Sequence, residues 1–232
     1  MEPEFWLALL LAALINLDRQ ALGQIGLSRP VATGALMGLL LDQALAGLTL
    51  GLWTELLWLT KPPLGGAMPP NGGLAVSAAL LGFQLLGRPL PSEKNIAGYV
   101  FLLIAVIPMA HLMAGIEVAS RRNGEKLTLK LKQALAAGLS PDALSFQLRG
   151  LGYVWLLGLL FVSIGSLVMA AWLKLGLTLL PESFWTLLYQ FGPLTPLIGV
   201  ATMTNRFDRS HLILFFLTLA VSLAVLWSTA WF

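Results

Sequence analysis

The chain has 232 residues, of which 57% are hydrophobic and 11% are charged, and its mean hydropathy is +0.82. Soluble domains carry about 25% charged residues, so this composition excludes an ordinary soluble domain and predicts an integral membrane protein. The chain has no cysteine, which excludes internal disulfides and thiolate metal sites. Its net charge of +3 comes from a few basic clusters, which indicate membrane topology rather than a nucleic-acid-binding surface.

The first apolar segment runs from Phe5 to about Leu27 and is long enough to cross a bilayer, which takes about 20 mostly apolar residues. It follows acidic residues and precedes no A-x-A-like cleavage site, so we expect a retained membrane helix rather than a signal peptide. Polar residues interrupt its second half. We expect them to form a turn or an internal charge cluster with a structural role: Asn16, Asp18, Arg19 and Gln20.

The stretch from Val31 to Asn71 is the most informative part of the sequence. Its apolar part, Val31 to Thr60, is too long for one span, and we expect two segments that meet near Asp42–Gly47, one of them re-entrant. Residues 61–73, KPPLGGAMPPNGG, hold too many Pro and Gly to stay helical. Broken backbone at membrane depth is tolerated only inside protein or along a cavity, so this stretch predicts a site for a polar solute.

Two carboxylates, Asp42 and Glu55, lie inside this apolar run. An acidic residue at membrane depth is costly, so it usually faces a cavity or a partner. Asp42 lies near the junction of the two segments, where it can bind a ligand or cap a helix, and we favour the cap. Glu55 directly precedes the broken segment and is therefore the stronger candidate for a binding role.

Residues 74–87 form an apolar run of about 14 residues, which is short for a span and typical of a re-entrant element or half-helix. After a polar loop at 88–95, residues 96–118 form a cleaner span that contains Pro108 and His111. A single histidine in a span is more often a packed, hydrogen-bonded residue than a proton or ligand site, and we expect this of His111.

Residues 119–150 differ in character because they are rich in lysine and arginine. Leucines recur there partly at helical spacing, so we expect one or two amphipathic helices on the membrane surface. Ser140–Asp142, SPD, predicts the N-cap of the second helix. The positive charge predicts a cytoplasmic location for this connection, where it either anchors on anionic lipid, as we favour, or docks a cytoplasmic protein.

The second half of the chain repeats the pattern of long and broken apolar segments. Residues 151–180 again exceed one span and hold Lys174. Residues 191–199, FGPLTPLIG, form a second broken segment, and residues 212–232 form a last span. Paired broken segments in two halves are typical of transporters built from internal repeats, so an internal repeat is one interpretation.

The fold class that follows is all-α. We predict a polytopic membrane protein with roughly six to eight membrane segments, including re-entrant or broken helices. It forms one membrane domain over residues 1–232, with an N-terminal half at 1–118, a cytoplasmic amphipathic connection at 119–150 and a C-terminal half at 151–232.

Ordered strings in the first half resemble a known family: Ser28-Arg29-Pro30, GLWTE at 51–55, PPLGG at 62–66 and PPN at 69–71. In this order and spacing they resemble the membrane subunit IIC of the mannose/sorbose class of sugar phosphotransferase systems (PTS). The match runs without gaps from Arg29 to about Gly82 and continues more loosely as far as GVATMTN at 199–205. The resemblance therefore covers most of the chain.

The resemblance implies a multi-pass permease subunit of the bacterial cytoplasmic (inner) membrane. In that family the IIC subunit pairs with a IID membrane subunit, and cytoplasmic IIB, supplied through IIA or IIAB, donates a phosphoryl group to the incoming sugar. IIC itself is not phosphorylated, so we expect no catalytic residue, cofactor or metal in this chain. We also expect a homo-oligomer in the lipid bilayer, and no nucleic-acid partner.

The resemblance and the broken segments together give the expected substrate-binding residues: Glu55, Trp58, Lys61, Gly65, Gly66, Asn71 and Asn205. Glu55 leads as an acceptor for sugar hydroxyls, and its alternative role is a structural partner of Arg29 or Lys61, or of a helix of the second subunit. Asn71 either reaches the ligand or caps the next helix. Trp58 either stacks on a sugar or, as we favour, marks the membrane interface.

The other expected site residues have simpler alternatives. Lys61 is either an ion-pair partner in the cavity or a snorkelling residue, and we slightly favour the second role. Gly65 and Gly66 permit a turn and a close approach of the backbone. Asn205 matches a family position near the second broken segment.

Two positions depart from the family pattern. The chain has Asp42-Gln43 where the family has Gly-Asp, and Pro70-Asn71 where the family has Pro-Asp. An amide accepts weaker hydrogen bonds than a carboxylate does, which weighs against mannose or another common hexose as the substrate. Three alternative functions stay open: a stand-alone secondary transporter, the membrane subunit of a vitamin importer, and a regulatory relative that has lost transport.

Overall fold

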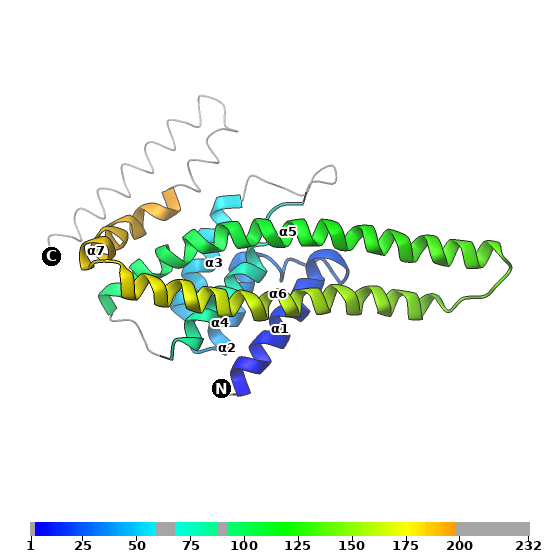
Figure 1. Ribbon diagram of the computed structural model, residues 1–232, viewed down its shortest axis with the longest axis horizontal. Coiled ribbons are helices and arrows are strands. Elements are labelled where there is room, and N and C mark those ends of the chain that lie inside the picture. The colour runs from blue at the N-terminus through cyan, green and yellow to red at the C-terminus, as the bar shows by residue number, and fades with distance from the viewer. Residues whose placement is uncertain (1–2, 59–67, 88–91, 198–232) are drawn as a thin grey trace, which may run out of the picture.

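The structure is a computed structural model that describes residues 3–58, 68–87 and 92–197. In this part of the chain there are seven α-helices and one 3-10 helix, and no strand (Figure 1). The predicted all-α fold is confirmed for the described residues. The expected span at 212–232 and most of the first broken segment lie outside them.

Helix α1, Pro3–Gln20, ends where the sequence becomes polar. Glu4 in its first turn and Arg19 in its last turn both complement the helix dipole. The Asp18 carboxylate organises the loop that follows, because it accepts hydrogen bonds from the backbone N–H groups of Ile25, Gly26 and Ser28 at 2.8–3.1 Å. For Asp18 the structure therefore shows the predicted structural role.

Helices α2 (Pro30–Leu40) and α3 (Ala44–Trp58) form a short hairpin. At about 1.5 Å per residue they are about 16 and 22 Å long, less than the roughly 30 Å of a bilayer core. The turn between them is a Schellman motif: Asp42 has a φ of +54°, and the Gln43 N–H donates to the Gly38 carbonyl at 2.7 Å. Asp42 therefore caps α2 through its backbone, and its side chain is exposed.

Glycines allow the two helices of this hairpin to touch backbone to backbone. Gly34 and Gly38 on α2 face Gly47 and Gly51 on α3, so each helix carries a GxxxG pattern. A Cβ atom placed on Gly47 would lie 2.1 Å from the Gly34 carbonyl oxygen. No residue larger than glycine fits there without moving one helix away from the other.

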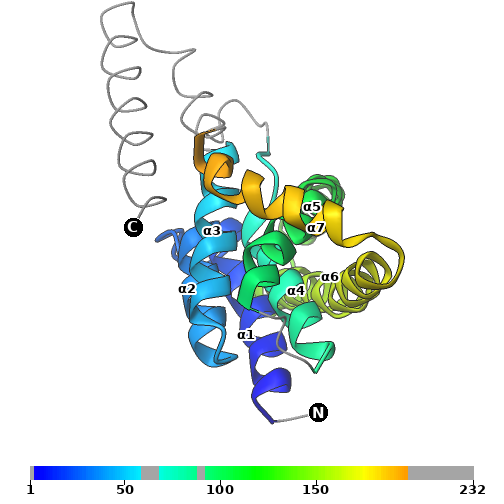
Figure 2. The same cartoon turned by 90° about the vertical axis from the view of Figure 1, so that its left-hand side faces the viewer.

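Helix α4, Gly72–Leu85, lies at the centre of the molecule, between the α2–α3 pair and the α5–α6 pair (Figure 2). All of its residues from Gly72 to Gly82 are buried, as expected for a helix that is apolar on every side. It has the 14 residues expected of a half-helix. Irregular backbone at Met68–Asn71 precedes it, within the first broken segment.

Helices α5 (Ser92–Ala136) and α6 (Ala143–Leu179) form a long antiparallel pair (Figure 1). Asn95–Ala136 and Ala143–Leu179 are both long and apolar enough to cross a membrane. At about 1.5 Å per residue α5 is about 67 Å long, so its distal part extends well past the body. We call residues 119–150, which form the tip of this pair, the arm.

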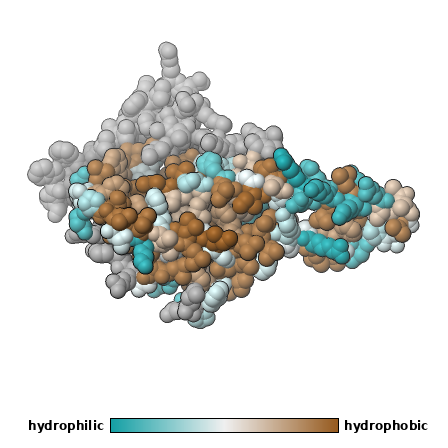
Figure 3. All heavy atoms as spheres, in the orientation of Figure 1, coloured by the Kyte–Doolittle hydropathy of each residue, from teal (hydrophilic) through white to brown (hydrophobic). Residues whose placement is uncertain are grey.

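The arm is helical as predicted, but its helices are not separate from the spans. They are the continuations of α5 and α6 beyond the apolar body, and the surface of the arm is much more hydrophilic than that of the body (Figure 3). Asp142 is the N-cap of α6, as predicted, and accepts a hydrogen bond from the Leu144 N–H at 3.1 Å.

Helix α7, Glu182–Phe191, packs back on the start of α5. Phe101 of α5 stacks on Trp172 of α6 with ring centroids 4.7 Å apart, and Trp185 of α7 lies 5.4 Å away from Phe101. The α-helix gives way to a 3-10 helix at Gly192–Leu194, where the second broken segment was predicted.

Candidate functional site

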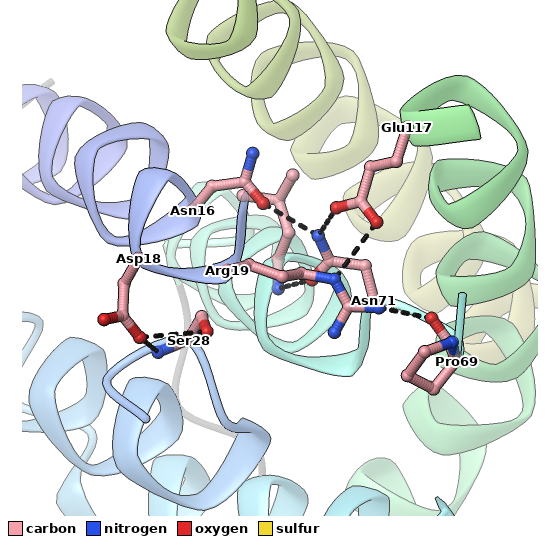
Figure 4. A network of polar contacts seen from close by, with 8 residues as sticks. Asn16, Asp18, Arg19, Ser28, Pro69, Asn71 and Glu117 are labelled. Atoms are coloured by element: carbon pink, nitrogen blue, oxygen red, sulfur yellow. Dashed lines mark hydrogen bonds and ion pairs between the residues drawn. The ribbon is translucent and has the colours of Figure 1, made fainter. Parts of the chain in front are cut away.

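A cluster of polar side chains lies buried inside the apolar body (Figure 4). We call it the polar centre, and it consists of Asn16 and Arg19 from α1, Asn71 from the segment before α4, and Glu117 from α5. Glu117 and Asn71 are each 1% exposed and Asn16 is 3% exposed. Buried polar groups are expensive unless hydrogen-bonded, so the geometry of this cluster is tightly constrained.

An ion pair between Arg19 and Glu117 forms the middle of the polar centre. The Arg19 Nε donates to Glu117 Oε2 at 3.0 Å, and the Arg19 Nη2 donates to the carbonyl oxygen of Pro69. The other Glu117 oxygen, Oε1, accepts a hydrogen bond from the Asn71 side-chain amide. One guanidinium and one carboxylate thus join α1, α5 and the irregular segment.

Asn71 uses every polar group that it has on protein partners. Its Nδ2 donates to Asn16 Oδ1 at 2.8 Å and to Glu117, and its Oδ1 accepts from the Leu74 N–H at 3.1 Å. Its backbone N–H donates to the Ala110 carbonyl at 3.0 Å. Of the two roles predicted for Asn71, the helix N-cap is the one that the structure shows, and contact with a ligand stays a prediction.

Two buried polar atoms near this region have no hydrogen-bond partner. One is the Nδ2 of Asn16, which faces α6 at Gly158, where a Cβ would lie 3.1 Å from it. The other is the Oγ1 of Thr54 on α3, close to the start of α4. A buried polar group without a partner costs free energy. These two atoms therefore mark places where the protein does not satisfy its own hydrogen-bonding groups.

Glu55 lies where α3 nears its end and α2 begins. Its Oε1 is 3.5 Å from Arg29 Nη1, and its Oε2 accepts a hydrogen bond from the Val31 N–H at 3.4 Å. The Arg29 side chain is 68% exposed and that of Glu55 is 16% exposed. The structure therefore shows the predicted ion pair with Arg29, and it leaves this carboxylate partly accessible near the broken segment.

Trp58 packs between the end of α3, the start of α4 and α5. Its ring lies directly over Gly72, where a Cβ would come within 2.7 Å of it, and meets the His111 ring edge-on at 5.8 Å. The His111 Nδ1 is 2.9 Å from the carbonyl oxygen of Ile107, one turn earlier on α5. His111 is thus hydrogen-bonded as predicted, although its side chain is exposed on the described part of the surface.

The other predicted site residues lie outside the described residues: Lys61, Gly65, Gly66 and Asn205. Glu55, Trp58 and Asn71 are all placed around the junction of α3, α4 and α5. They do not share one hydrogen-bond network, because Asn71 points into the polar centre while Glu55 contacts the start of α2.

Sequence reasoning missed Glu117, which is the most buried charged residue in the described part of the chain. One signal was available, because Glu117 is the only acidic residue in the predicted span at 96–118. Its partner Arg19 was noted but was assigned to a local cluster with Asp18. The pairing depends on how α1, which packs on α4 and α6, is brought near α5, and no local pattern encodes this arrangement.

In chemical terms the region offers donors and acceptors rather than reactive groups. Guanidinium, carboxylate, carboxamide and backbone carbonyl groups are suited to hydrogen bonding with polyhydroxylated solutes. Within residues 3–58, 68–87 and 92–197, no group of three or more His, Cys, Asp or Glu side chains is placed to hold a metal ion.

Solved structures with a similar fold exist. One, described as "Structure of membrane protein", has a TM-score of 0.67 and 17% identity, and the alignment covers 97% of this chain and 87% of the other. Another is a cryo-EM structure of the mannose transporter ManYZ with microcin E492 (MceA), with a TM-score of 0.52 and 18% identity, covering 95% and 86%. No curated protein matches the chain significantly.

The sequence family of PTS system sorbose-specific IIC components (EII-Sor) matches residues 4–229. This range covers nearly the whole chain, including the described helices and the segments between them. The predicted resemblance is therefore confirmed, and the short, broken helices and buried polar groups described above are those of a polytopic membrane protein. The chain belongs to the sorbose-specific IIC component family of the phosphotransferase system.

Proposed function

We propose that this chain is the IIC permease subunit of a mannose-class phosphotransferase system, which forms a sugar translocation path together with a IID subunit. The observation that carries the proposal is the match to the IIC family over residues 4–229. The fold shared with the mannose transporter ManYZ supports it. In this scheme the incoming sugar is phosphorylated by a cytoplasmic IIB protein, and IIC supplies the path.

The architecture supports transport of a polar solute. The body is covered by apolar side chains, as Figure 3 shows for one face, while α2, α3 and α4 are too short to span a bilayer on their own. Irregular backbone at membrane depth needs partners inside the protein or along a cavity. Its described part, Met68–Asn71, lies against the buried polar centre and is consistent with that requirement.

We place the sugar site near Glu55 and Trp58, with Lys61, Gly65, Gly66 and Asn205 as further expected contacts. Glu55 has a partly accessible carboxylate that can accept hydrogen bonds from sugar hydroxyls. Trp58 offers an aromatic face. In this proposal Asn71 supports the site as the N-cap of α4, since its own donors are already used.

The proposed setting is the bacterial cytoplasmic membrane, with the protein in a homo-oligomer. The arm, residues 119–150, would lie on the cytoplasmic side because it carries the densest positive charge. There it can contact anionic lipid or the phosphocarrier proteins. IIB and IIA or IIAB are the expected cytoplasmic partners.

The test is uptake of labelled sugars into membrane vesicles that contain this chain and its IID partner, with and without IIA, IIB and a phosphodonor. The proposal predicts sugar phosphate inside the vesicles only when the phosphodonor chain is complete. Accumulation of free sugar without donors would instead indicate a stand-alone transporter. Absence of any sugar phosphate with every partner combination would reject the phosphotransferase role.

A further inference from the structure

The ion pair between Arg19 and Glu117 has no assigned role in the proposed sugar site. The Arg19 side chain is 16% exposed and that of Glu117 is 0% exposed. Buried ion pairs generally do not add stability, because the desolvation penalty offsets their attraction, and apolar replacements are often neutral or better. An ionisable pair at this depth therefore needs a reason other than stability.

The contacts of the pair point to such a reason, because both members bind the same irregular segment. Arg19 donates to the Pro69 carbonyl, and Glu117 accepts from the Asn71 side chain. The Asn71 backbone N–H is held by the Ala110 carbonyl, two turns before Glu117 on the same face of α5. The segment Pro69–Asn71 is thus clamped between α1 and α5.

A charged clamp suits this segment for a chemical reason. Pro69 and Pro70 have no backbone N–H, so neither can donate to a helical hydrogen-bond ladder. The Pro70 carbonyl accepts a hydrogen bond from the Gly72 N–H at 3.0 Å, whereas the Pro69 carbonyl accepts one from the Arg19 side chain. An apolar body supplies no water that could replace this donor. A guanidinium provides several donors in a fixed fork, and Arg19 uses that fork on the Pro69 carbonyl and on Glu117, which balances its charge.

The clamped segment in turn positions the start of α4, against which Trp58 packs. Asn71 caps α4, and the first residue of α4, Gly72, lies against the Trp58 ring and Thr54. Glu55 lies on α3 less than one turn before Trp58. A shift of Pro69–Asn71 would therefore move the start of α4 relative to the two described residues of the proposed site.

We infer that Arg19 and Glu117 are positioning residues that fix Pro69–Asn71, and through it the start of α4, so that Trp58 and Glu55 keep the geometry needed for sugar binding. This inference rests on the proposed function. It predicts that sugar binding requires the two hydrogen bonds donated by the Arg19 guanidinium, and not only its positive charge. It also predicts a change in substrate affinity without a change in the amount of assembled protein.

The experiment compares three variants in the complete membrane complex. Arg19→Lys keeps the charge and loses the fork. The double variant Arg19→Gln/Glu117→Gln removes both charges together, which avoids leaving one buried charge unpaired. Glu4→Gln is the matched control, because it removes a carboxylate in the same way at an exposed position of α1, the helix that carries Arg19, away from the polar centre and from the arm.

Two measurements are made on each variant. The first is phosphodonor-dependent uptake of labelled sugar over a range of concentrations, which separates KM from the maximal rate. The second does not depend on transport: the chain has no cysteine, so Met68→Cys gives a single thiol beside the clamped segment. Its rate of reaction with a maleimide reports how firmly that segment is held.

We expect Arg19→Lys and the double variant to raise KM and the labelling rate at position 68, each by about tenfold, the effect of losing one charge-assisted hydrogen bond. Glu4→Gln should change neither. Labelling and KM at the wild-type level in both variants would overturn the inference, as would failure of both to assemble, which would make the pair a requirement for folding. If wild-type complexes transport no sugar, the proposed function fails while the labelling result still tests the clamp.

Discussion

The Glu55 carboxylate joins the two ends of the α2–α3 hairpin through an ion pair with Arg29, whose side chain is 68% exposed, and a hydrogen bond from the Val31 N–H. Ion pairs with an exposed partner contribute about 0–1 kcal/mol to stability, so we expect the fold to tolerate the loss of this charge. We expect Glu55→Gln to insert and assemble normally but to reduce the initial rate of sugar uptake by about tenfold, because a charge-assisted hydrogen bond to the sugar is lost.

The measurement is initial uptake normalised to the amount of IIC in the membrane and to the amount of IID that co-purifies. Normal uptake in Glu55→Gln would remove this carboxylate from the site. Reduced co-purification with unchanged uptake per complex would assign Glu55 to partner assembly, which is one of its alternative roles.

Asn71 donates both amide hydrogens to acceptors, so its exchange for aspartate is a sharp test of the polar centre. Asn71→Asp replaces those donors by a second carboxylate facing Glu117 and Asn16, and we expect a loss of about 3 kcal/mol or more. The combined variant Asn71→Asp/Glu117→Gln restores one amide and one carboxylate with their positions exchanged. It should recover most of the stability.

Thermal unfolding of the purified complex in detergent checks this prediction. The single variant should unfold several degrees below the wild type, and the exchanged pair should lie between them. Equal midpoints for Asn71→Asp and the wild type would show that the Asn71 amide donors do not matter. A double variant no better than the single one would show that Asn71 and Glu117 do not act as a pair.

The role of a single residue could be predicted from the sequence only where its partner lies in a nearby segment of the chain or where its residue type suits few roles. The N-cap was one of the two roles predicted for Asn71, and Arg29 was one of the alternative partners named for Glu55. Glu117 was not predicted, because its contacts come from residues 46 and 98 positions away in the chain.

The α2–α3 hairpin depends on its glycines, since helices in an apolar surrounding associate through close packing rather than through the hydrophobic effect. We expect Gly47→Ala to destabilise the protein by roughly 1–3 kcal/mol or more, because the new Cβ meets backbone of α2 and cannot be relieved by a side-chain rotation. Gly115→Ala on α5 is the control, since nothing lies within 4 Å of its Cβ position.

Unfolding midpoints of the two alanine variants provide the measurement. Gly115→Ala should be neutral or slightly stabilising, because alanine favours the helix by roughly 1 kcal/mol. A Gly47→Ala variant as stable as Gly115→Ala would contradict the close packing of α2 on α3.

The division of Val31–Thr60 into two short helices could be predicted, because this apolar run is too long for a single span. The continuity of the arm with α5 could not, since a basic segment with recurring leucines is typical of a surface helix. In the structure α5 continues into the arm because residues 119–136 contain no Pro and a single Gly, Gly124, among mostly good helix formers. Gly138, with a φ of +73°, lies in the turn that follows.

At the scale of the whole molecule, an apolar body carries a long polar extension at one end (Figure 3). Exposed leucines and isoleucines of the body lie on α1, α2, α3, α5, α6 and α7, so apolar side chains face outward as well as inward. A soluble protein would hide that surface. From the positive-inside rule we expect the basic residues of the arm to keep that end of the α5–α6 pair in the cytoplasm: Arg121, Arg122, Lys126, Lys130, Lys132 and Arg149.

The orientation predicted from this charge can be tested with single thiols, because the chain has no cysteine. Ser140 lies exposed in the turn of the arm, and Ser183 lies exposed at the start of α7, beyond the other end of α6. Since α6 is about 55 Å long at about 1.5 Å per residue, the two positions lie on opposite sides of a membrane that α6 crosses once.

An impermeant maleimide should therefore label Ser140→Cys only in inside-out vesicles and Ser183→Cys only in intact spheroplasts, with total labelling after detergent as the reference. Labelling of Ser140→Cys in spheroplasts would place the arm outside the cell and contradict its assignment to the phosphocarrier side, whereas labelling of both from the same side would show that α6 does not cross the membrane.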